Sequence, residues 1–550
     1  MHNSFNIFPI YLSFTRNMNT LKLSNFFIFF LIVLQSGTEI EGYNILCIFP
    51  SISYSHQKPM LAVSEALARK GHNVTAITLN PNKKLNLKNY RQVDANSLYE
   101  VWARLQSSVG FSLQQRMTAF EVVKGFVDSS EIMNRAMLYH PAIDGFAREL
   151  ESSNTTYDVV IYEALIYTSL LGMVLQNGKP LPPTIGLLTL SVFSDADWFM
   201  GNPFAESYIP TLNVPFNDQM TFYQRLYSLM VILYTWLQVT YKCRPIQEAL
   251  MKERFGQNLP SIEEIERNRS MLFYLNDFTT GYLRPVQQNT IFVGPINVEN
   301  QPVEPLPQDL QEWMDGAEEG VIYFSLGSNM KGTSFPAEKR AAFIDAFSRL
   351  DKFRVLWKWE DDRLPDQPSN TLIRKWLPQN SILAHPKTKL FISQMGHQSS
   401  QEAINFAIPM LGIPIYGDQL QNALKFEKDG ISIHMDIEDV DFNANVYNNI
   451  QRLLTNITYK QSMLRLQRLS RDKPMSAADT AVWWVEYVAR HKGAPHLRPT
   501  VLDLPWYQVY LIDIILFVLA VLAVIILSLF MLLKMLCRCR TKADKKVKVN

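Results

Sequence analysis

The sequence predicts an α/β protein made of two successive strand-and-helix halves, followed by one membrane-spanning helix near the C-terminus. Short runs of β-branched and apolar residues alternate with amphipathic stretches on both sides of a proline-rich segment, which is typical of βαβ units. Residues 514–533 carry no formal charge, and this length matches a hydrocarbon core of about 30 Å. The chain has 550 residues, which is enough for several domains.

The composition describes a folded chain without a preference for nucleic acid. Hydrophobic residues make up 47% of the chain and charged residues 19%, which excludes an intrinsically disordered protein. The formal net charge is only +2 and most of the excess lies at the C-terminus, so we expect no nucleic-acid partner. The chain has four cysteines. Cys47 and Cys243 alone cannot form a disulfide framework, so apolar cores must stabilise the two halves.

The two ends of the chain predict a single-pass membrane protein. Residues 1–40 resemble a signal peptide, because a short apolar run at 26–34 follows basic residues and precedes a polar stretch; Met18 is an alternative start. The predicted membrane helix covers residues 511–535, and a basic tail at 536–550 should remain cytoplasmic. Three aromatic residues precede the helix as an interfacial belt: Trp506, Tyr507 and Tyr510.

This topology places both halves in the lumen or outside the cell, where sequons can be glycosylated. The sequons lie at Asn73, Asn154, Asn268 and Asn456. Asn73 begins a predicted strand, so we expect it to be shielded.

The first half, residues 41–294, opens with a βαβ unit. Its predicted strands span residues 43–49, 73–79, 158–162 and 184–190. A polar loop at 51–59 and an amphipathic helix at 60–70, which Gly71 ends, connect the first two strands. A stretch rich in Tyr, Phe and Leu at 220–241 predicts a long helix.

The second half, residues 308–500, follows a linker at 295–307 that contains several prolines and few large apolar residues. Its predicted strands include 320–325, 390–392 and 410–412. A polar turn at 393–400 leads into a helix near 402–407. Since ligands bind at the carboxyl ends of parallel strands, the two halves predict facing Rossmann-like domains with a cleft between them.

The segment from Trp376 to Gln419 carries side chains suited to a nucleotide-sugar. Trp376 offers an aromatic face for a base, and stacking of this kind contributes roughly 1–3 kcal/mol. The turn and helix after the strand at 390–392 aim free N–H groups at a pyrophosphate, with Ser399 and Ser400 as helix caps. Glu402 can accept hydrogen bonds from a ribose diol.

These motifs, in this order, resemble the signature of the UDP-glycosyltransferases, the family that includes the UDP-glucuronosyltransferases. The resemblance rests on residues 376–379, 391–402 and 414–419, and it extends to 325–328 and 490–498. It implies the GT-B architecture, in which the N-terminal half receives an acceptor and the C-terminal half a UDP-sugar. It also implies transfer of glucose or glucuronate, with inversion, to a hydroxyl of a small lipophilic acceptor.

The resemblance assigns the donor-binding residues one by one. They are Ser325, Ser328, Trp376, Gln379, Gln394, Gly396, His397, Gln398, Ser399, Glu402, Asp418 and Gln419. Trp376 is expected to stack on uracil, and Glu402 to bind ribose. The serines and the turn at 396–399 are expected to hold the phosphates, while Asp418 and Gln419 bind the sugar.

The chain departs from the family pattern at one turn, where His-Gly-Gly is common and Gln394-Met395-Gly396 stands here. Gln394 can still donate to a phosphate. Met395 places a side chain where backbone must approach the ligand or adopt a positive φ. Such a side chain can weaken activity, so a membrane-anchored protein that binds nucleotide-sugars with little or no turnover is the alternative function.

The catalytic base is predicted in the first half. His56 follows the first strand, where an imidazole can take a proton from an acceptor hydroxyl. Glu163 ends another strand and can orient that imidazole. The matching family residues are a His and an Asp, so Glu163 is one methylene longer than the pattern.

No cofactor and no metal are expected, because N–H groups and the helix dipole can stabilise the leaving UDP. The acidic pairs Asp195/Asp197 and Asp439/Asp441 have a spacing that can bind a metal. We interpret them instead as ordinary loop and helix-start residues. Aromatic residues in the segment 192–223 can line an acceptor pocket: Phe193, Trp198, Phe199, Phe204, Tyr208, Phe216, Phe222 and Tyr223.

The resemblance places the protein in the endoplasmic reticulum membrane with lumenal domains, and it leaves a homo- or hetero-oligomer open.

Overall fold

The computed structural model describes residues 42–109, 117–165, 167–299, 302–328 and 330–547. The predicted signal peptide, residues 1–40, lies outside the described residues. The contacts that follow all lie within the compact unit that begins at Asn44.

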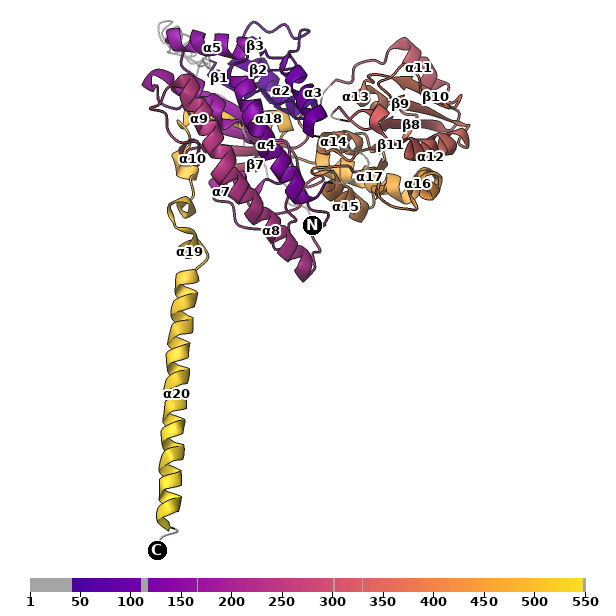
Figure 1. Cartoon of the computed structure of the whole chain (residues 1–550). Helices are drawn as coiled ribbons and strands as arrows, with labels where there is room; N and C mark the ends of the chain where they lie inside the picture. The colour runs from indigo at the N-terminus through magenta and orange to yellow at the C-terminus, as the bar shows by residue number, and fades with distance from the viewer. Residues whose placement is uncertain (1–41, 110–116, 166, 300–301, 329, 548–550) are drawn as a thin grey trace, which may run out of the picture. The chain divides into compact units, whose positions relative to one another are not determined.

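The N-terminal half is built on a parallel sheet, seven-stranded within the described residues, in the order β3-β2-β1-β4-β5-β6-β7. Figure 1 shows β1, β2 and β3 next to one another in the indigo part of the chain. The strands are β1 Asn44–Phe49, β2 Asn73–Thr78, β3 Tyr90–Asp94, β4 Val159–Glu163, β5 Thr184–Leu188, β6 Met271–Tyr274 and β7 Thr290–Phe292. The central strands β4 and β5 are buried along their whole length, as expected for a parallel sheet covered on both faces.

The helices of this half confirm the predicted α/β alternation but correct one boundary. They are α2 Tyr54–Arg69, α3 Leu98–Val109, α4 Ala119–Leu138, α5 Pro141–Ser152, α6 Gly172–Leu175, α7 Ser194–Phe199, α8 Phe222–Gln238, α9 Arg244–Phe255 and α10 Ile262–Arg267. The predicted loop at 51–59 is wrong, because α2 begins at Tyr54 and runs through Pro59. Pro59 lies early in the helix, where its ring removes only the hydrogen bond to the Ser55 carbonyl.

The C-terminal half is built on a second parallel sheet, six-stranded in the described part of the chain, in the order β10-β9-β8-β11-β12-β13. The strands are β8 Gly320–Ser325, β9 Phe353–Lys358, β10 Thr371–Arg374, β11 Thr388–Ser393, β12 Met410–Gly412 and β13 Ser432–His434. The helices are α11 Gln308–Asp315, α12 Ala337–Ser348, α13 Gln379–Ala384, α14 His397–Asn405, α15 Gln419–Lys428, α16 Phe442–Thr455, α17 Ile457–Arg471 and α18 Ala477–Arg490. A buried aromatic cluster that includes Phe324, Phe343 and Trp357 packs one face of this sheet.

The two halves are tied together at their ends. The described parts of the predicted linker, 295–299 and 302–307, form turns and coil between β7 and α11. Helix α18, within the predicted second domain, packs on α2 and β4 of the first sheet. His72 at the end of α2 lies 3.1 Å from Glu486 of α18 through its Nε2 and the carboxylate Oε1.

The chain ends in α19 Trp506–Val509 and α20 Ile512–Val547. Among the described residues, one helix is long and apolar enough to cross a membrane, and it covers Ile512–Cys537. The span is not buried against the rest of the protein. This helix coincides with the predicted membrane segment 511–535.

Candidate functional site

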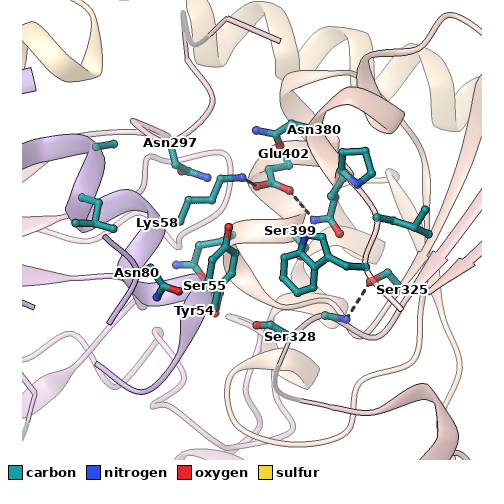
Figure 2. Close-up of a pocket in the computed structure, with 18 of the residues that line it drawn as sticks. Tyr54, Ser55, Lys58, Asn80, Asn297, Ser325, Ser328, Asn380, Ser399 and Glu402 are labelled. Carbon is teal, nitrogen blue, oxygen red and sulfur yellow. Dashed lines mark hydrogen bonds and ion pairs between the residues drawn. The ribbon is translucent and has the colours of Figure 1, made fainter. Parts of the chain in front are cut away.

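A first cavity of about 880 Å³ lies at the carboxyl ends of the second sheet, with its other wall formed by the first half and the linker. Figure 2 shows Lys58 and Tyr54 of α2 and Asn297 of the linker on one side, facing Ser399 and Glu402 on the other. Nine of the twelve predicted donor-binding residues line it: Ser325, Ser328, Trp376, Gln379, Gln394, Gly396, Gln398, Ser399 and Glu402. The strand-end position predicted for a ligand therefore holds a cavity of suitable size.

Trp376 stands at the rim of this cavity, after β10. Its side chain is 58% exposed, and its ring meets the ring of Tyr54 edge-on, with centroids 5.4 Å apart. The ammonium of Lys358 lies 5.9 Å from the ring centroid. The exposed indole is accessible to a base, which can stack on it.

Glu402 is buried on α14 and receives donors from both halves. Its carboxylate lies 2.5 Å from Nζ of Lys58 and 2.5 Å from Nε2 of Gln379. The amide of Asn380 reaches both carboxylate oxygens when its nitrogen is turned toward them. Gln379 in turn accepts from the hydroxyl of Tyr323 and donates to Ser399. The network fixes the carboxylate at the wall of the cavity (Figure 2).

The N-terminus of α14 forms the floor of the cavity. The helix begins at His397, not near Glu402, and Gly396 is its N-cap without a side chain to cap it. The predicted caps are wrong: Ser399 accepts from Gln379, and Ser400 donates to the carbonyl of Gly396. First-turn N–H groups of a helix without a side-chain cap attract anions.

Met395 does not obstruct this floor. Its backbone adopts a positive φ of 62°, but its side chain is fully buried and does not line the cavity. It packs against β12, where a Cβ added to Gly412 would lie 2.6 Å from Cγ and Cε of Met395. Asn422 donates to the Met395 carbonyl over 3.0 Å. The glycine in β12 therefore provides the space that the methionine needs.

His56 lies in the first turn of α2 and contacts Glu163, the last residue of β4. Nδ1 of His56 is 2.8 Å from Oε1 of Glu163. The carboxylate is buried, whereas the imidazole remains 20% exposed. Because β1 and β4 are parallel neighbours, their carboxyl ends bring the two side chains together. The pairing leaves Nε2 of His56 for a second partner.

A second cavity of about 830 Å³ includes His56. Most of its wall is apolar and comes from α4, α8 and the segment around α7, while Tyr416, Gly417 and Asp418 enter it from the second half. Burial raises the pKa of Asp418, whose carboxylate accepts from Asn422 over 2.8 Å. Tyr54, Ser55 and Lys58 line the first cavity while His56 lines the second. The first turn of α2 therefore separates the two cavities.

The comparisons with known proteins agree with this geometry. The model of the family described as UDP-glucoronosyl and UDP-glucosyl transferase matches residues 45–548. The chain belongs to the UDP-glycosyltransferase family. UDP-glycosyltransferase UGT5 of Dactylopius coccus is 35% identical over 542 residues, which cover 95% of this chain and 100% of that protein. UDP-glucuronosyltransferase 1A3 of Homo sapiens is 30% identical over 482 residues, which cover 85% of this chain and 87% of that protein.

Solved structures show the same fold. TcCGT1 in complex with UDP superposes with a TM-score of 0.52 at 15% identity, covering 82% of this chain and 100% of that chain. The glycosyltransferase VinC in complex with dTDP also gives 0.52, at 16% identity with the same coverage. The predicted GT-B architecture of two Rossmann-like domains is confirmed.

Three predicted donor-binding side chains of this UDP-glycosyltransferase lie away from the first cavity. Asp418 lines the second cavity. Gln419 accepts from the backbone N–H groups of Ile415 and Tyr416 and so holds its own loop. His397 is buried with Nε2 3.3 Å from the Thr280 hydroxyl, and burial lowers its pKa to about 4. A sequence motif orders these residues but does not show where their side chains point.

Two residues of the first cavity of the glycosyltransferase carried no sequence signal. Lys58 follows His56 by two positions and is an ordinary helical lysine by pattern, yet it reaches Glu402. Asn297 is buried, and its side-chain amide has no hydrogen-bond partner among the described residues. An unpaired buried amide at a cavity wall is free to bind a ligand. Only the fold brings these residues to the site.

Three of the eight aromatic residues that were predicted to line an acceptor pocket line the second cavity: Phe193, Trp198 and Phe204. Phe199, Tyr208, Phe216, Phe222 and Tyr223 do not. The acidic residues of this segment form ion pairs instead: Asp195 lies 2.6 Å from Arg244, and Asp197 lies 3.3 Å from Arg284.

Proposed function

We propose that this glycosyltransferase transfers glucose or glucuronate from a UDP-sugar to a hydroxyl of a small lipophilic acceptor, with inversion at the anomeric carbon. The observation that carries the proposal is the position of the His56–Glu163 pair. It opens into an apolar cavity that also contains Asp418 of the donor half, and it lies one helical turn from the first cavity.

The donor occupies the first cavity in this proposal. Uracil stacks on Trp376, and the ribose diol donates to Glu402 in place of one of the present donors Lys58, Gln379 and Asn380. The diphosphate lies against Ser325, Ser328 and the first turn of α14, where N–H groups stabilise the charge that develops on leaving UDP. The sugar then extends toward Asp418, which lines the second cavity. No cofactor and no metal enter this scheme.

Proton transfer in this proposal runs through His56. With Nδ1–H donated to Glu163, Nε2 accepts the proton of the acceptor hydroxyl as its oxygen attacks the anomeric carbon. One C–O bond forms while the bond from the anomeric carbon to the UDP oxygen breaks, and UDP leaves with the bonding electrons. The buried Glu163 carboxylate stabilises the imidazolium that results. A single displacement inverts the anomeric centre.

The alternative of a nucleotide-sugar-binding protein with little or no turnover depended on Met395. With that side chain packed against Gly412 and outside the first cavity, none of the described residues favours this alternative. The exposed apolar helix α20 supports anchoring in a membrane.

We place the two halves in the lumen of the endoplasmic reticulum, with type I topology. The basic residues after the span support this orientation. All four sequon asparagines are exposed. Asn73, which was predicted to be shielded, is exposed because it is the first residue of β2.

The proposal is tested by turnover of the full chain in membranes with a panel of phenols and both UDP-glucose and UDP-glucuronate. We expect one donor to be used and the product of an α-linked donor to be a β-glycoside, read from its anomeric proton coupling. Trp376→Ala should weaken UDP binding by roughly 1–3 kcal/mol. Binding of UDP without product from any acceptor would favour the binding protein instead.

A further inference from the structure

The second cavity is bordered by large apolar side chains that are exposed. Each of them is between 39% and 60% exposed: Phe126, Trp198, Phe204, Leu233, Trp236, Trp506 and Tyr510. We call these seven residues the apolar rim. A contiguous exposed apolar surface of this kind marks a site that another apolar phase covers.

Helix α8 extends the rim with an apolar face of its own. Five of its exposed apolar residues recur at helical spacing: Phe222, Leu226, Leu229, Leu233 and Trp236. The helix contains one charged residue, Arg225. A helix on the surface of a soluble protein normally turns polar residues outward. Because Leu233 and Trp236 also line the second cavity, the face and the rim are continuous.

The rim is also continuous with the membrane span. The segment before the span packs on the first half, since a Cβ at Gly201 would lie 2.7 Å from Val501 and 2.8 Å from Pro499. Tyr510 lines the second cavity, and the span begins two residues later at Ile512. Two residues extend at most about 7 Å. That distance is comparable to the headgroup layer of about 5–7 Å on each side of the hydrocarbon core.

We propose that the apolar rim and the outer face of α8 rest in the headgroup region of the same bilayer that α20 spans, and that acceptors enter the second cavity from the lipid. The occupant is the bilayer, because the span fixes Tyr510 at its surface and α8 carries a single charged residue, Arg225, which is too little charge to bind a polar partner. Entry from lipid gives lipophilic acceptors a high local concentration at the mouth of the cavity. This second part of the proposal rests on the proposed function, and the first part does not.

The docking is tested with spin labels on the full chain in phosphatidylcholine vesicles. Cys47 and Cys243 are buried, so replacing Cys537 and Cys539 by serine provides a background for labelling. A nitroxide at Leu229→Cys should collide more with oxygen than with a water-soluble nickel complex. The matched control is Leu464→Cys on α17, which has the same 40% exposure and should report water. Water-like accessibility at position 229, or dipolar coupling between labels of two copies, would overturn the docking.

Entry from the lipid is tested with the double variant Leu226→Glu/Leu229→Glu, whose positions lie outside both cavities. In vesicles we expect KM to rise at least about five-fold for a lipophilic phenol, because the charges lift the rim from the bilayer. KM for a freely water-soluble phenol, KM for the UDP-sugar and the unfolding temperature should stay unchanged. Equal KM values for the lipophilic phenol in variant and wild type would overturn lipid entry. A wild type without any turnover would refute the proposed function and leave the spin-label result standing.

Discussion

Lys58 of the N-terminal half and Glu402 of the C-terminal half form an ion pair across the first cavity, with Nζ and Oε1 2.5 Å apart. The Glu402 side chain is buried, whereas the Lys58 side chain is 31% exposed. Glu402 is the residue that we expect to bind ribose, so one carboxylate serves both the donor and the contact between the halves. Lys58 also lies two residues from His56, on the turn that separates the two cavities.

Replacement of Lys58 by methionine should weaken UDP binding by about five-fold, because the diphosphate loses a cation near its site, an effect of about 1 kcal/mol. Lys58→Arg retains the charge and should bind nearly as wild type. Isothermal titration calorimetry at low and high salt measures both, and the difference should shrink as salt screens the charge. Tighter UDP binding by Lys58→Met would instead show that the ion pair competes with ribose.

Glu163→Gln should lower kcat by about 100-fold or more while UDP affinity stays unchanged. The neutral amide no longer stabilises the imidazolium, and its NH2 group can donate to Nδ1 and so select the wrong tautomer. Glu163→Asp keeps the charge but shortens the side chain, so its loss should be smaller. Steady-state kinetics with calorimetric UDP binding distinguishes these effects. A wild-type kcat in Glu163→Gln would exclude Glu163 from orienting the base.

Much of the fold follows from the sequence because it depends on local patterns. The strand Met410–Gly412 has the predicted bounds, and the membrane helix and both α/β halves lie where apolar periodicity places them. The start of α2 was missed because the polar residues at 51–59 were interpreted as a loop, although polar residues and a proline are tolerated in the first turns of a helix. The start of α14 was missed because Gly396 offers no capping side chain.

The site was predicted as far as its motifs reach. Trp376, Glu402 and the strand ends belong to contiguous signatures, whereas Lys58 meets Glu402 across 344 residues of chain. The wall of the second cavity is built by α4 and α8, whose apolar residues look the same in sequence as residues of an ordinary core. The contact of Lys58 with Glu402 and the packing of α4 and α8 around the cavity have no local chemical signal, so this sequence did not reveal them.

Met395→Gly and Met395→Ala should both destabilise the protein, because each leaves a void against β12 that costs about 2–4 kcal/mol. The alanine variant keeps a side chain at positive φ, so it should be less stable than the glycine variant by about 1 kcal/mol. Thermal or urea unfolding of the full chain measures the difference. UDP binding should stay as in wild type, and a clear change in it would place Met395 at the donor site.

Gly412→Ala should destabilise the protein through a clash with Met395, whose Cγ and Cε lie 2.6 Å from the added Cβ. Combined with Met395→Gly, the alanine gains the space that the methionine vacates. The double variant should therefore be more stable than the sum of the two single losses predicts, with a coupling of about 1–3 kcal/mol. Simple additivity in urea unfolding would contradict this packing.

Stability should fall as pH decreases from about 6.5 to about 4 because of His397. Burial lowers the pKa of His397 from 6.5 to about 4, so across this window the unfolded chain binds a proton that the folded chain does not. The loss amounts to about 3 kcal/mol below pH 4 and is absent above 6.5. His397→Gln should remove this part of the pH dependence in urea unfolding. If His397→Gln and wild type show the same dependence of stability on pH between 4 and 6.5, folding does not lower the pKa of His397.

The account depends on a donor held by the C-terminal half and a base supplied by His56 of the N-terminal half. Parallel measurement of turnover and UDP affinity for wild type and His56→Ala tests this most directly. We predict that His56→Ala lowers kcat by at least about 100-fold, the lower range for general base catalysis, with an unchanged Kd for UDP. Wild-type turnover by His56→Ala would contradict the account, and so would loss of UDP binding together with turnover.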